Sequence, residues 1–448
     1  SRFSLPDFGE GDRGWGFASE LAIKVVHLFF GDSGLFGKDS GLKSDLDQLM
    51  AKRELDAIVV VGDEVYSSPR AYLTNGVHMT TGLVLKKRGD APVIIASAME
   101  TEEAAKSGLK VYSYYDLDFA QMLNDAEGDR AKAEVRFWGK ALETIGVPSG
   151  KIGIYGVAHA NAILELVRRL EKTYRQYEFV GELGMTLFDE AYVTKDADEV
   201  ERLRSVGQRT SAALQAAWDL VRAQRVEGDQ LVKTDGTPFT IGDVRRFVRR
   251  TLLDHDLEDT GMIFAQGRDA GYPHSRGEND MALRLGQSIV FDLFPQEIGG
   301  GYFHDMTRTW CLGYAPPEVQ QAYDEVMEAF DVAVEVFRAG MPAKQLQATV
   351  QDYFESKGHP TSRSEPGNTV GFVHSLGHGL GLNIHERPSL SHLSKDTLQR
   401  GNVVSIEPGV YYPDRGFGVR VEDTFYVSED GSLVSLTNFR KDLVIPVG

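Results

Sequence analysis

Residues 374–386 read His-Ser-Leu-Gly-His-Gly-Leu-Gly-Leu-Asn-Ile-His-Glu, and three of the chain's eleven histidines fall within them: His374, His378 and His385. The glycines between them allow a close approach of the backbone, and imidazoles can act as neutral metal ligands or proton carriers. A fourth histidine, His274, follows Gly-Tyr-Pro. An isolated histidine is more often a packed core residue than a ligand, but histidines gathered among glycines and acids indicate a site.

Four carboxylates stand on or beside predicted strands rather than on solvated helical faces. Burying a carboxylate costs several kcal/mol unless a cation or a donor compensates its charge. Two Asp, two Glu and one His form an oxygen-rich set that can hold two divalent ions, with a carboxylate bridging them. Salt bridges to Arg308 and Arg420 are the alternative, and spacing alone leaves both open. The acids are Asp292 in 288–294, Asp305 at the start of 305–310, Glu407 after 403–406 and Glu422 in 418–424.

The first half of the chain has an α/β pattern. Between residues 46 and 156, short β-type runs alternate with helical stretches such as 131–145. The β-type runs are 57–61, 82–85, 92–96 and 151–155. Residues 1–40 are rich in glycine and weakly patterned, so we expect an N-terminal extension there.

A new pattern begins at Asp196, where Glu199 makes an Asp variant of the capping box at the start of a predicted helix. A second helix is expected over 316–337, where apolar residues recur at helical spacing. Strands are expected at 288–294, 302–312, 403–406 and 419–427. The second half is therefore predicted to be α+β, with a domain boundary near 185–195.

Composition restricts the class of protein. The 448 residues are 42% hydrophobic, and their formal net charge of −18 argues against nucleic acid as a partner because no basic cluster offsets it. The single cysteine, Cys311, cannot form an internal disulfide, which is typical of a reducing compartment. The stretch 21–30 is interrupted by Lys24 and His27, and no run approaches the roughly 20 apolar residues that span a membrane. We expect a cytoplasmic protein with no membrane partner.

The order of these motifs resembles a known family. An Asp, a second Asp, the histidine segment 374–386, Glu-Pro-Gly at 407–409 and Arg-Val-Glu-Asp at 420–423 are similar to the prolidase and aminopeptidase P branch of the pita-bread metallopeptidases, family M24. The likeness extends to 71–76, which resembles part of that family's creatinase-type N-terminal domain. It implies an α/β creatinase-like domain at 41–187 and an α+β pita-bread catalytic domain at 188–448.

The resemblance also implies a role for each site residue. Asp292, Asp305, His378, Glu407 and Glu422 would hold two divalent ions per subunit, Mn above all, with Co, Zn or Fe as alternatives. His274 and His385 would face the substrate, and His374 would line the pocket. Relatives commonly form homodimers, so the resemblance implies a homodimer that acts on short peptides.

The chain departs from the family pattern in two places. Asp292 and Asp305 are thirteen positions apart where the family usually has eleven, so two residues are inserted around the glycines at 299–301. We expect a longer turn or a bulge to bring both carboxylates to one cavity. Asp269 replaces the usual Asn, and Ser275-Arg276 replaces the usual aromatic residue after Pro-His. Both of these changes fall near the expected substrate side.

The predicted reaction is metal-assisted hydrolysis of a peptide bond. Two ions would share a water as a hydroxide nucleophile, and Glu407 would be the general base. His274, His385 and His374 would complete the catalytic set, the first two by donating to the developing oxyanion. The nucleophile is thus a metal-bridging hydroxide in this hypothesis.

The specificity is open between several alternatives. Arg420 and Arg387 are the predicted substrate-binding arginines, and Arg363 and Arg276 are further candidates for gripping a C-terminal carboxylate. The resemblance favours an Xaa-Pro dipeptidase or aminopeptidase, and the arginines leave room for carboxypeptidase-type cleavage. An organophosphate ester hydrolase and, in a different class, a non-catalytic pita-bread binding module are the remaining alternatives.

Overall fold

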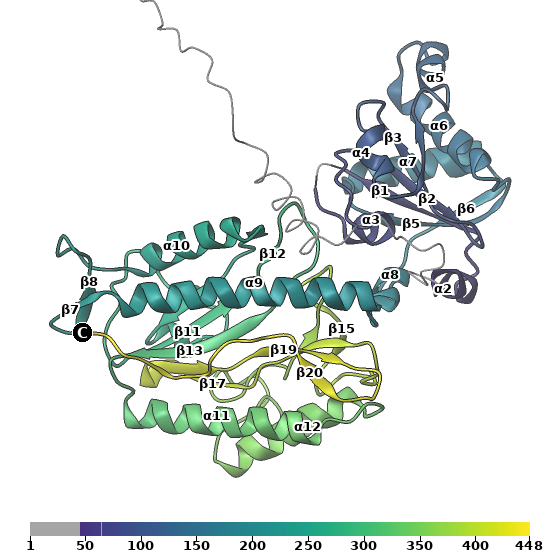
Figure 1. The fold of residues 1–448 in the computed structure, drawn as a ribbon. Helices are drawn as coiled ribbons and strands as arrows, with labels where there is room; N and C mark the ends of the chain where they lie inside the picture. Colours follow the sequence, from purple (N-terminus) through teal and green to yellow (C-terminus); the bar gives the residue numbers. More distant parts are fainter. Residues whose placement is uncertain (1–44, 64) are drawn as a thin grey trace, which may run out of the picture. The chain divides into compact units, whose positions relative to one another are not determined.

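The computed structural model describes residues 45–63 and 65–448, whose elements are labelled in Figure 1. The N-terminal extension expected at 1–40, with its apolar stretch 21–30, lies outside the described residues. No helix of the described part combines the length and the apolar character that a membrane crossing requires.

The first half builds one six-stranded sheet in the order β4-β3-β2-β1-β5-β6. β1 pairs antiparallel with β2 and parallel with β5. Its side chains alternate between two faces, so that Val59 packs with Leu142 of α6 while Ile58 packs in a separate apolar cluster. The strands are β1 Ala57–Gly62, β2 Gly82–Lys87, β3 Val93–Ala96, β4 Lys110–Ser113, β5 Gly150–Gly156 and β6 Tyr177–Val180. The predicted alternation of strands and helices is confirmed here.

The helices of this half connect and cover the strands. They are α2 Leu46–Lys52, α3 Ser68–Thr74, α4 Thr101–Ala105, α5 Phe119–Asp125, α6 Arg130–Thr144 and α7 Ala160–Thr173. α8 (Leu187–Ala191) follows the last strand and leads into the second half. The helix expected at 131–145 corresponds to α6 within one residue.

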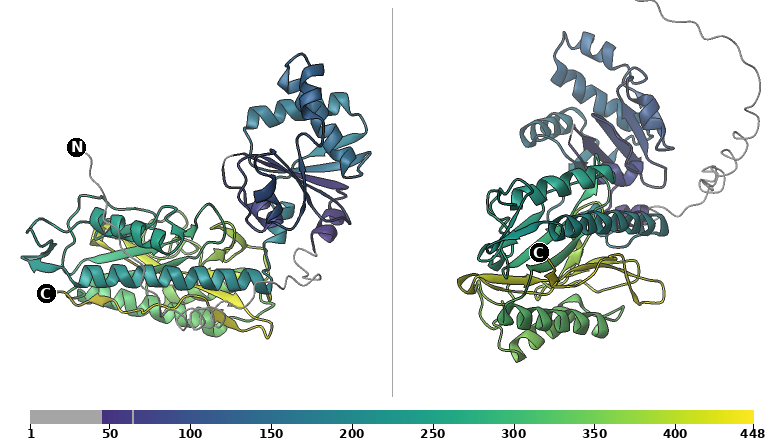
Figure 2. Two further views of the ribbon diagram at one scale, coloured as in Figure 1. Left: turned by 45° about the horizontal axis from the view of Figure 1, so that its top comes forward. Right: turned by 60° about the vertical axis from the view of Figure 1, so that its left-hand side comes forward.

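The second half places two layers of helices around several sheets. α9 (Ala197–Arg222) and α10 (Ile241–Asp254) lie on one side of the strands, and α11 (Pro317–Val336) and α12 (Ala343–Ser356) lie on the other (Figures 1 and 2). Two apolar clusters fill the layers. One joins Leu214 of α9 to Phe291, and the other joins Phe330 of α11 to Val419. The sheets therefore have apolar contacts on both faces, as an α+β arrangement requires.

α9 begins where the sequence predicts a capping box. Asp196 accepts a hydrogen bond of 2.9 Å from the backbone N–H of Glu199, and the Glu199 carboxylate accepts one of 3.0 Å from the N–H of Asp196. Each of these hydrogen bonds satisfies a backbone N–H group that the start of a helix would otherwise leave unpaired. The predicted start is confirmed, and so is the helix expected over 316–337, which is α11.

Two sheets of the second half carry the site. The first has the order β10-β11-β13-β21 and the second β15-β14-β16-β19-β20, while β17 pairs with β18. Their strands are β10 Ile263–Gln266, β11 Ser288–Leu293, β13 Met306–Leu312, β14 His378–Gly379, β15 Glu386–Ser389, β16 Val403–Ile406, β17 Gly409–Tyr412, β18 Phe417–Arg420, β19 Asp423–Val427, β20 Leu433–Ser435 and β21 Val444–Ile445. The short strands at the periphery are β7 Arg225–Glu227, β8 Gln230–Val232, β9 Leu257–Glu258 and β12 Gln296–Glu297. The single strand expected over 419–427 is interrupted, because Val421 and Glu422 separate β18 from β19.

Candidate metal centre

A cavity of about 750 Å³ opens among the strands of the second half. It is lined by every residue that the sequence assigns to the metal site. The three predicted catalytic histidines and the two predicted substrate-binding arginines, Arg420 and Arg387, line it as well. The five predicted ligands are Asp292 in β11, Asp305 directly before β13, His378 at the start of β14, Glu407 directly after β16 and Glu422 between β18 and β19. Strand ends that are remote in sequence thus converge on one cavity.

The inserted residues between Asp292 and Asp305 leave the two carboxylates in the same cavity. In the β11–β13 pair Asp292 lies opposite Thr307, so Asp305, two residues before Thr307, belongs to the same face of the sheet. The connection between β11 and β13 contains the short strand β12, which pairs with β9, and a turn at 299–301. Gly299 and Gly300 in this turn have φ values of 77° and 97°, a region that favours glycine. The register of β11 and β13 is continuous and has no bulge, and both carboxylates line one cavity.

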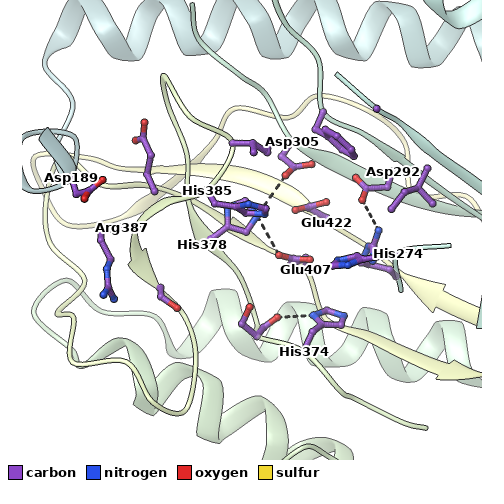
Figure 3. Close-up of a pocket in the computed structure, with 18 of the residues that line it drawn as sticks. Asp189, His274, Asp292, Asp305, His374, His378, His385, Arg387, Glu407 and Glu422 are labelled. Carbon is purple, nitrogen blue, oxygen red and sulfur yellow. Dashed lines mark hydrogen bonds and ion pairs between the residues drawn. The ribbon is translucent and has the colours of Figure 1, made fainter. Parts of the chain in front are cut away.

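Three side chains approach each other at metal-ligand spacing. One ligand atom from each of Asp305, His378 and Glu422 lies within 4.8 Å of the others. Nε2 of His378 is 3.6 Å from Oδ2 of Asp305 and 3.5 Å from Oε1 of Glu407. Figure 3 shows these four side chains turned toward one another, with Asp292 beside them.

The imidazole of His378 has a fixed orientation. Its Nδ1 lies 3.0 Å from the carbonyl oxygen of Gly379, a contact in which Nδ1–H donates. Burial lowers the pKa of His378 to about 4, so the ring is neutral at pH 7. The Nε2 lone pair is therefore left facing the carboxylates, as it is in histidines that ligate a metal.

Three buried carboxylate oxygens have no hydrogen-bond partner among the described residues. They are Oδ1 of Asp292, Oδ1 of Asp305 and Oε1 of Glu422. Buried polar atoms are nearly always paired, so each of these requires an explanation. Burial, together with the charges of the neighbouring carboxylates, raises the pKa of both Asp305 and Glu422 well above the ordinary value. Bound cations would satisfy all three oxygens at once, and the donor set therefore fits divalent metal ions.

The salt-bridge alternative explains only part of this charge. Arg420 donates from Nη2 to Oδ2 of Asp292 over 2.6 Å, so one carboxylate does have the expected arginine partner. Arg308 instead pairs with Asp423, at 2.8 Å. Thr307 donates its hydroxyl to Oε2 of Glu422 over 2.7 Å. These contacts hold one oxygen of each acid and leave the other directed at the cavity.

Glu407 combines burial with access to the cavity. Burial, opposed by the charge of Arg420 and reinforced by Asp292, raises its pKa to about 7. The hydroxyl of Ser405 lies 3.4 Å from Oε1 and donates to it. A carboxylate with a pKa near neutrality is suited to accept and return a proton at physiological pH.

The three other histidines occupy different surroundings. His274 is exposed at the cavity, and the ring of His385 packs edge-on against that of His378 at 4.5 Å between centroids. His374 donates from Nδ1 to the carbonyl of Ser375 over 2.7 Å, and its Nε2 lies 2.9 Å from the Tyr411 hydroxyl. Burial lowers the pKa of His374 to about 3, so it accepts from Tyr411 as a neutral ring.

Tyr411 is a site residue that the sequence analysis did not identify. Its hydroxyl also accepts a 3.0 Å hydrogen bond from Nη1 of Arg420. A chain of contacts thus runs from His374 through Tyr411 and Arg420 to Asp292. Its position two residues after the Glu-Pro-Gly motif, on a β-type run, was the available signal.

The two predicted substrate-binding arginines differ in how exposed their side chains are and in how many partners they have. The Arg420 side chain is only 3% exposed, and its donors already contact Asp292, Thr307 and the Pro273 carbonyl. Arg387 is 41% exposed and pairs with Asp396 at 2.9 Å. In Figure 3 Arg387 lies on the opposite side of the carboxylates from His274.

Comparison with known proteins identifies relatives over much of the chain. The model of metallopeptidase family M24 matches residues 201–429. The Xaa-Pro dipeptidase of Pyrococcus furiosus is 36% identical over 255 residues, which are 56% of this chain and 65% of that protein. The Xaa-Pro dipeptidase of Pyrococcus horikoshii is 25% identical over 401 residues, which are 89% of this chain and 97% of that protein. The chain spans about half to two thirds of the length of several other curated relatives that it matches.

Solved structures have the same fold. The Xaa-Pro dipeptidase from Bacillus anthracis superposes with a TM-score of 0.69 at 23% identity, covering 90% of this chain and 98% of that one. The X-Pro aminopeptidase from Thermotoga maritima gives a TM-score of 0.66 at 21% identity, covering 87% and 97%. The expected pita-bread fold class is confirmed, as is the resemblance read from the motifs. The chain belongs to metallopeptidase family M24, in the branch of prolidases and Xaa-Pro aminopeptidases.

Proposed function

We propose that this protein hydrolyses peptide bonds in short peptides as a dinuclear metallopeptidase of the Xaa-Pro dipeptidase or aminopeptidase type. The observation that supports it best is the group of unpartnered oxygens on Asp292, Asp305 and Glu422 around a single cavity, facing the lone pair of His378. Divalent ions bound there would lower the pKa of a water molecule and polarise a peptide carbonyl. The proposed ligands are Asp292, Asp305, His378, Glu407 and Glu422.

The proposed catalytic roles follow from the state of each side chain. Glu407 accepts a proton from the attacking water and delivers it to the leaving nitrogen, for which a pKa of about 7 is well placed. His274 and His385 line the same cavity and offer ring N–H groups to the oxygen that gains charge. His374 is bonded to Tyr411 and orients the Tyr411–Arg420 pair rather than moving protons.

The wider proposals rest on composition and on relatives. We propose Mn as the principal ion, with Co, Zn or Fe as substitutes, because oxygen-rich ligation suits Mn. The division into a domain at 41–187 and a catalytic domain at 188–448, a homodimer, and a cytoplasmic location belong to the same proposal. The buried Cys311, whose pKa burial raises to about 12, fits a reducing compartment.

A peptide panel read by mass spectrometry tests the proposal. Purified protein is incubated with Xaa-Pro dipeptides, tripeptides and peptides blocked at either terminus, with Mn and after EDTA treatment. We expect hydrolysis of short peptides only with Mn, and the fragment masses identify the end that is attacked. Metal analysis should give two ions per chain after loading. Absence of hydrolysis with fewer than one bound ion would contradict the proposed function.

Removing the metal should change how stability depends on pH. The folded-state pKa of Glu407, about 7, lies above its ordinary value of 4.5, so the folded protein without metal holds this proton more tightly than the unfolded chain does. That stabilisation is complete below pH 4.5 and is lost as pH rises through 7. The unfolding midpoint of EDTA-treated protein should therefore fall over this range relative to Mn-loaded protein, measured by calorimetry.

The metal-loaded protein is the control, because the titrating groups outside the proposed ligand set contribute equally to both samples. At neutral pH a metal ion at 100 times its Kd adds about 2.7 kcal/mol to the free energy of unfolding. Parallel midpoints for the two samples across pH 4.5–7 would contradict a buried acidic cluster that a cation compensates.

A further inference from the structure

Two acids line the cavity outside the proposed ligand set, Glu386 and Asp189, and each accepts hydrogen bonds from neighbouring residues. Glu386 receives a hydrogen bond of 2.6 Å from Lys195, and both side chains are at most 3% exposed. The Asp189 carboxylate accepts from the N–H and the hydroxyl of Thr186, at 2.9 and 2.7 Å, in the capping box of α8. Among the described lining residues beyond the proposed ligands, Glu386 thus has a cationic partner, and Asp189 is held by neutral donors through one oxygen.

Two of the three arginines among the described lining residues are paired with acids. Arg420 is neutralised by Asp292, and Arg387 by Asp396. Arg276 is exposed and lines the cavity two residues after His274. Among the described lining residues it is the guanidinium for which the structure records neither a hydrogen bond nor an ion pair. The charge of Arg276 is therefore uncompensated at the wall of the cavity, in the segment between β10 and β11 that also carries His274.

The backbone around Arg276 defines where its guanidinium lies. A Cβ atom at Gly261 would be 2.9 Å from Nη2 of Arg276 and 3.3 Å from its Cζ, so the guanidinium rests directly against a residue that has no side chain. Gly261 itself lines the cavity. The guanidinium therefore lies beside a backbone position that lines the cavity.

Asp259, two residues before Gly261, does not compensate Arg276. Asp259 pairs with Arg249 at 2.8 Å and accepts from the N–H groups of Gly261 and Met262, at 3.0 and 2.8 Å. Its oxygens are thus bound by neighbours of their own, and the charge of Arg276 remains available.

The segment that follows Arg276 is held by a buried arginine. Nη1 of Arg245 donates to the carbonyl of Gly277 over 3.3 Å and to Oδ1 of Asn279 over 2.8 Å. The N–H of Gly242 in α10 also donates to the Asn279 carbonyl, at 2.8 Å. A guanidinium on an anchored segment loses less conformational entropy when it binds a ligand, which favours a fixed recognition role.

We propose that Arg276 binds the free α-carboxylate of the peptide substrate and so makes the enzyme select peptides by their C-terminal end. The inference rests on the proposed peptidase function and specifies its substrate class. A planar guanidinium matches a carboxylate through two parallel hydrogen bonds, and no competing acid occupies it. Dipeptides, or longer peptides that lose their C-terminal residue, are then the preferred substrates, and peptides with an amidated C-terminus are cleaved much more slowly.

Kinetics on matched peptides test this assignment. Wild-type protein and R276Q are assayed with Mn on Ala-Pro, on Ala-Pro amide and on N-acetylated Ala-Pro. Because a hydrogen-bonded charged pair is removed, kcat/KM of R276Q on the free acid should fall about 10- to 100-fold. Its value on the amide should stay within about twofold of wild type, since that substrate never used the pair. Arg276→Lys should restore part of the loss, because it keeps the charge without the fork.

Two controls separate the possible causes. R284Q removes an exposed guanidinium that pairs with Asp229 at 2.6 Å outside the cavity, and it should leave all rates unchanged. Ala-Glu amide carries its carboxylate on the side chain only. Cleavage of this peptide as fast as of Ala-Pro would overturn the α-carboxylate assignment, as would an equal loss of R276Q on acid and amide or no loss at all.

Binding distinguishes failure of the inference from failure of the proposed function. If wild-type protein hydrolyses none of the peptides, the proposed function is contradicted, and calorimetric titration of Ala-Pro and its amide decides the inference. Binding of the acid at least tenfold tighter than the amide in wild type, and equal binding in R276Q, would support the role of Arg276. Equal binding of acid and amide to wild-type protein would overturn it.

Discussion

Replacing Glu407 with glutamine is expected to lower kcat by about 10²- to 10⁴-fold. The carboxylate lies 3.5 Å from Nε2 of His378, at the edge of the ligand cluster, and burial raises its pKa to about 7. Glutamine has nearly the same shape but cannot accept a proton, so the attacking water would lose its base. The change also removes one negative charge from a site that we propose binds two cations.

Metal analysis and a pH profile separate these two effects. E407Q that retains two ions and folds like wild type, but has lost turnover across the pH range, has lost a general base. Loss of metal together with turnover would assign Glu407 mainly to ligation. E429Q is the matched control, because Glu429 is exposed two residues beyond the end of β19 and does not line the cavity. A wild-type kcat in E407Q would refute the assignment of Glu407 as the base.

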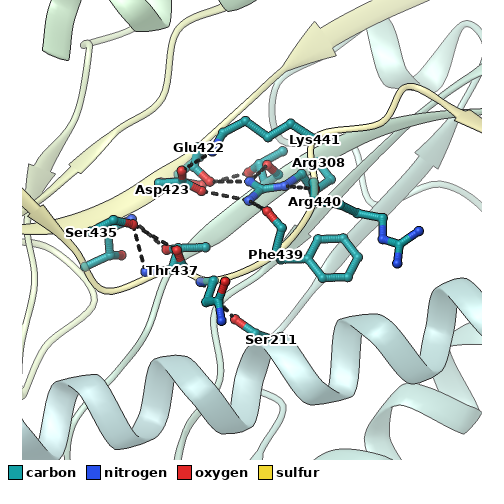
Figure 4. A network of polar contacts seen from close by, with 12 residues as sticks. Ser211, Arg308, Glu422, Asp423, Ser435, Thr437, Phe439, Arg440 and Lys441 are labelled. Carbon is teal, nitrogen blue, oxygen red and sulfur yellow. Dashed lines mark hydrogen bonds and ion pairs between the residues drawn. The ribbon is translucent and has the colours of Figure 1, made fainter. Parts of the chain in front are cut away.

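Replacing Arg308 with methionine is expected to destabilise the fold by about 3–5 kcal/mol, since it breaks a buried charge pair from one side. The Arg308 side chain is 1% exposed and pairs with Asp423 at 2.8 Å. It also donates to the carbonyl oxygens of Glu422, Phe439 and Arg440, at 2.7, 3.0 and 2.8 Å. Figure 4 shows these groups converging on one guanidinium. Methionine fills a similar volume but satisfies none of them.

Urea denaturation of R308M and wild type measures the difference, and the transition midpoint should move with little change in slope. R415M is the control, because Arg415 makes an exposed pair with Glu318 and such pairs contribute at most about 1 kcal/mol. Lys441 also pairs with Asp423, so the remaining carboxylate is not entirely unpaired in R308M. A loss below about 1 kcal/mol would mean that solvent or Lys441 replaces the guanidinium, contrary to this expectation.

Local signals were sufficient to predict much of the fold. The capping box at Asp196 and the helical spacing of Val326 and Phe330 depend on residues within a few positions, and α9 and α11 form as predicted. The candidate ligands could also be found in sequence, because a carboxylate inside a strand such as β11 is costly without a partner. The order of the motifs, which resembles that of a known family, indicated that acids on separate strands belong to one site. Residue spacing alone does not indicate this.

Pairings between distant segments could not be predicted in this way. Tyr411 becomes part of the site only because β17 brings it to His374, and Thr307 only because β13 lies beside Glu422. Which arginine is free is likewise a property of the folded state. Sequence spacing placed Arg308 and Arg420 near acids but could not reveal that Arg308 pairs with Asp423. Nor could it reveal that Arg276 has no ion-pair partner among the residues that the structure describes.

The hydrogen bond from His378 to the Gly379 carbonyl bears on which metal the protein binds. A ring held by its own neighbour's carbonyl presents the same nitrogen to every first-row divalent ion, and the surrounding oxygens accept several of them. Which of these metals is bound then depends on their abundance as well as on the preference of the oxygen ligands for Mn. Material purified from cells grown on different trace-element supplements should carry correspondingly different metals.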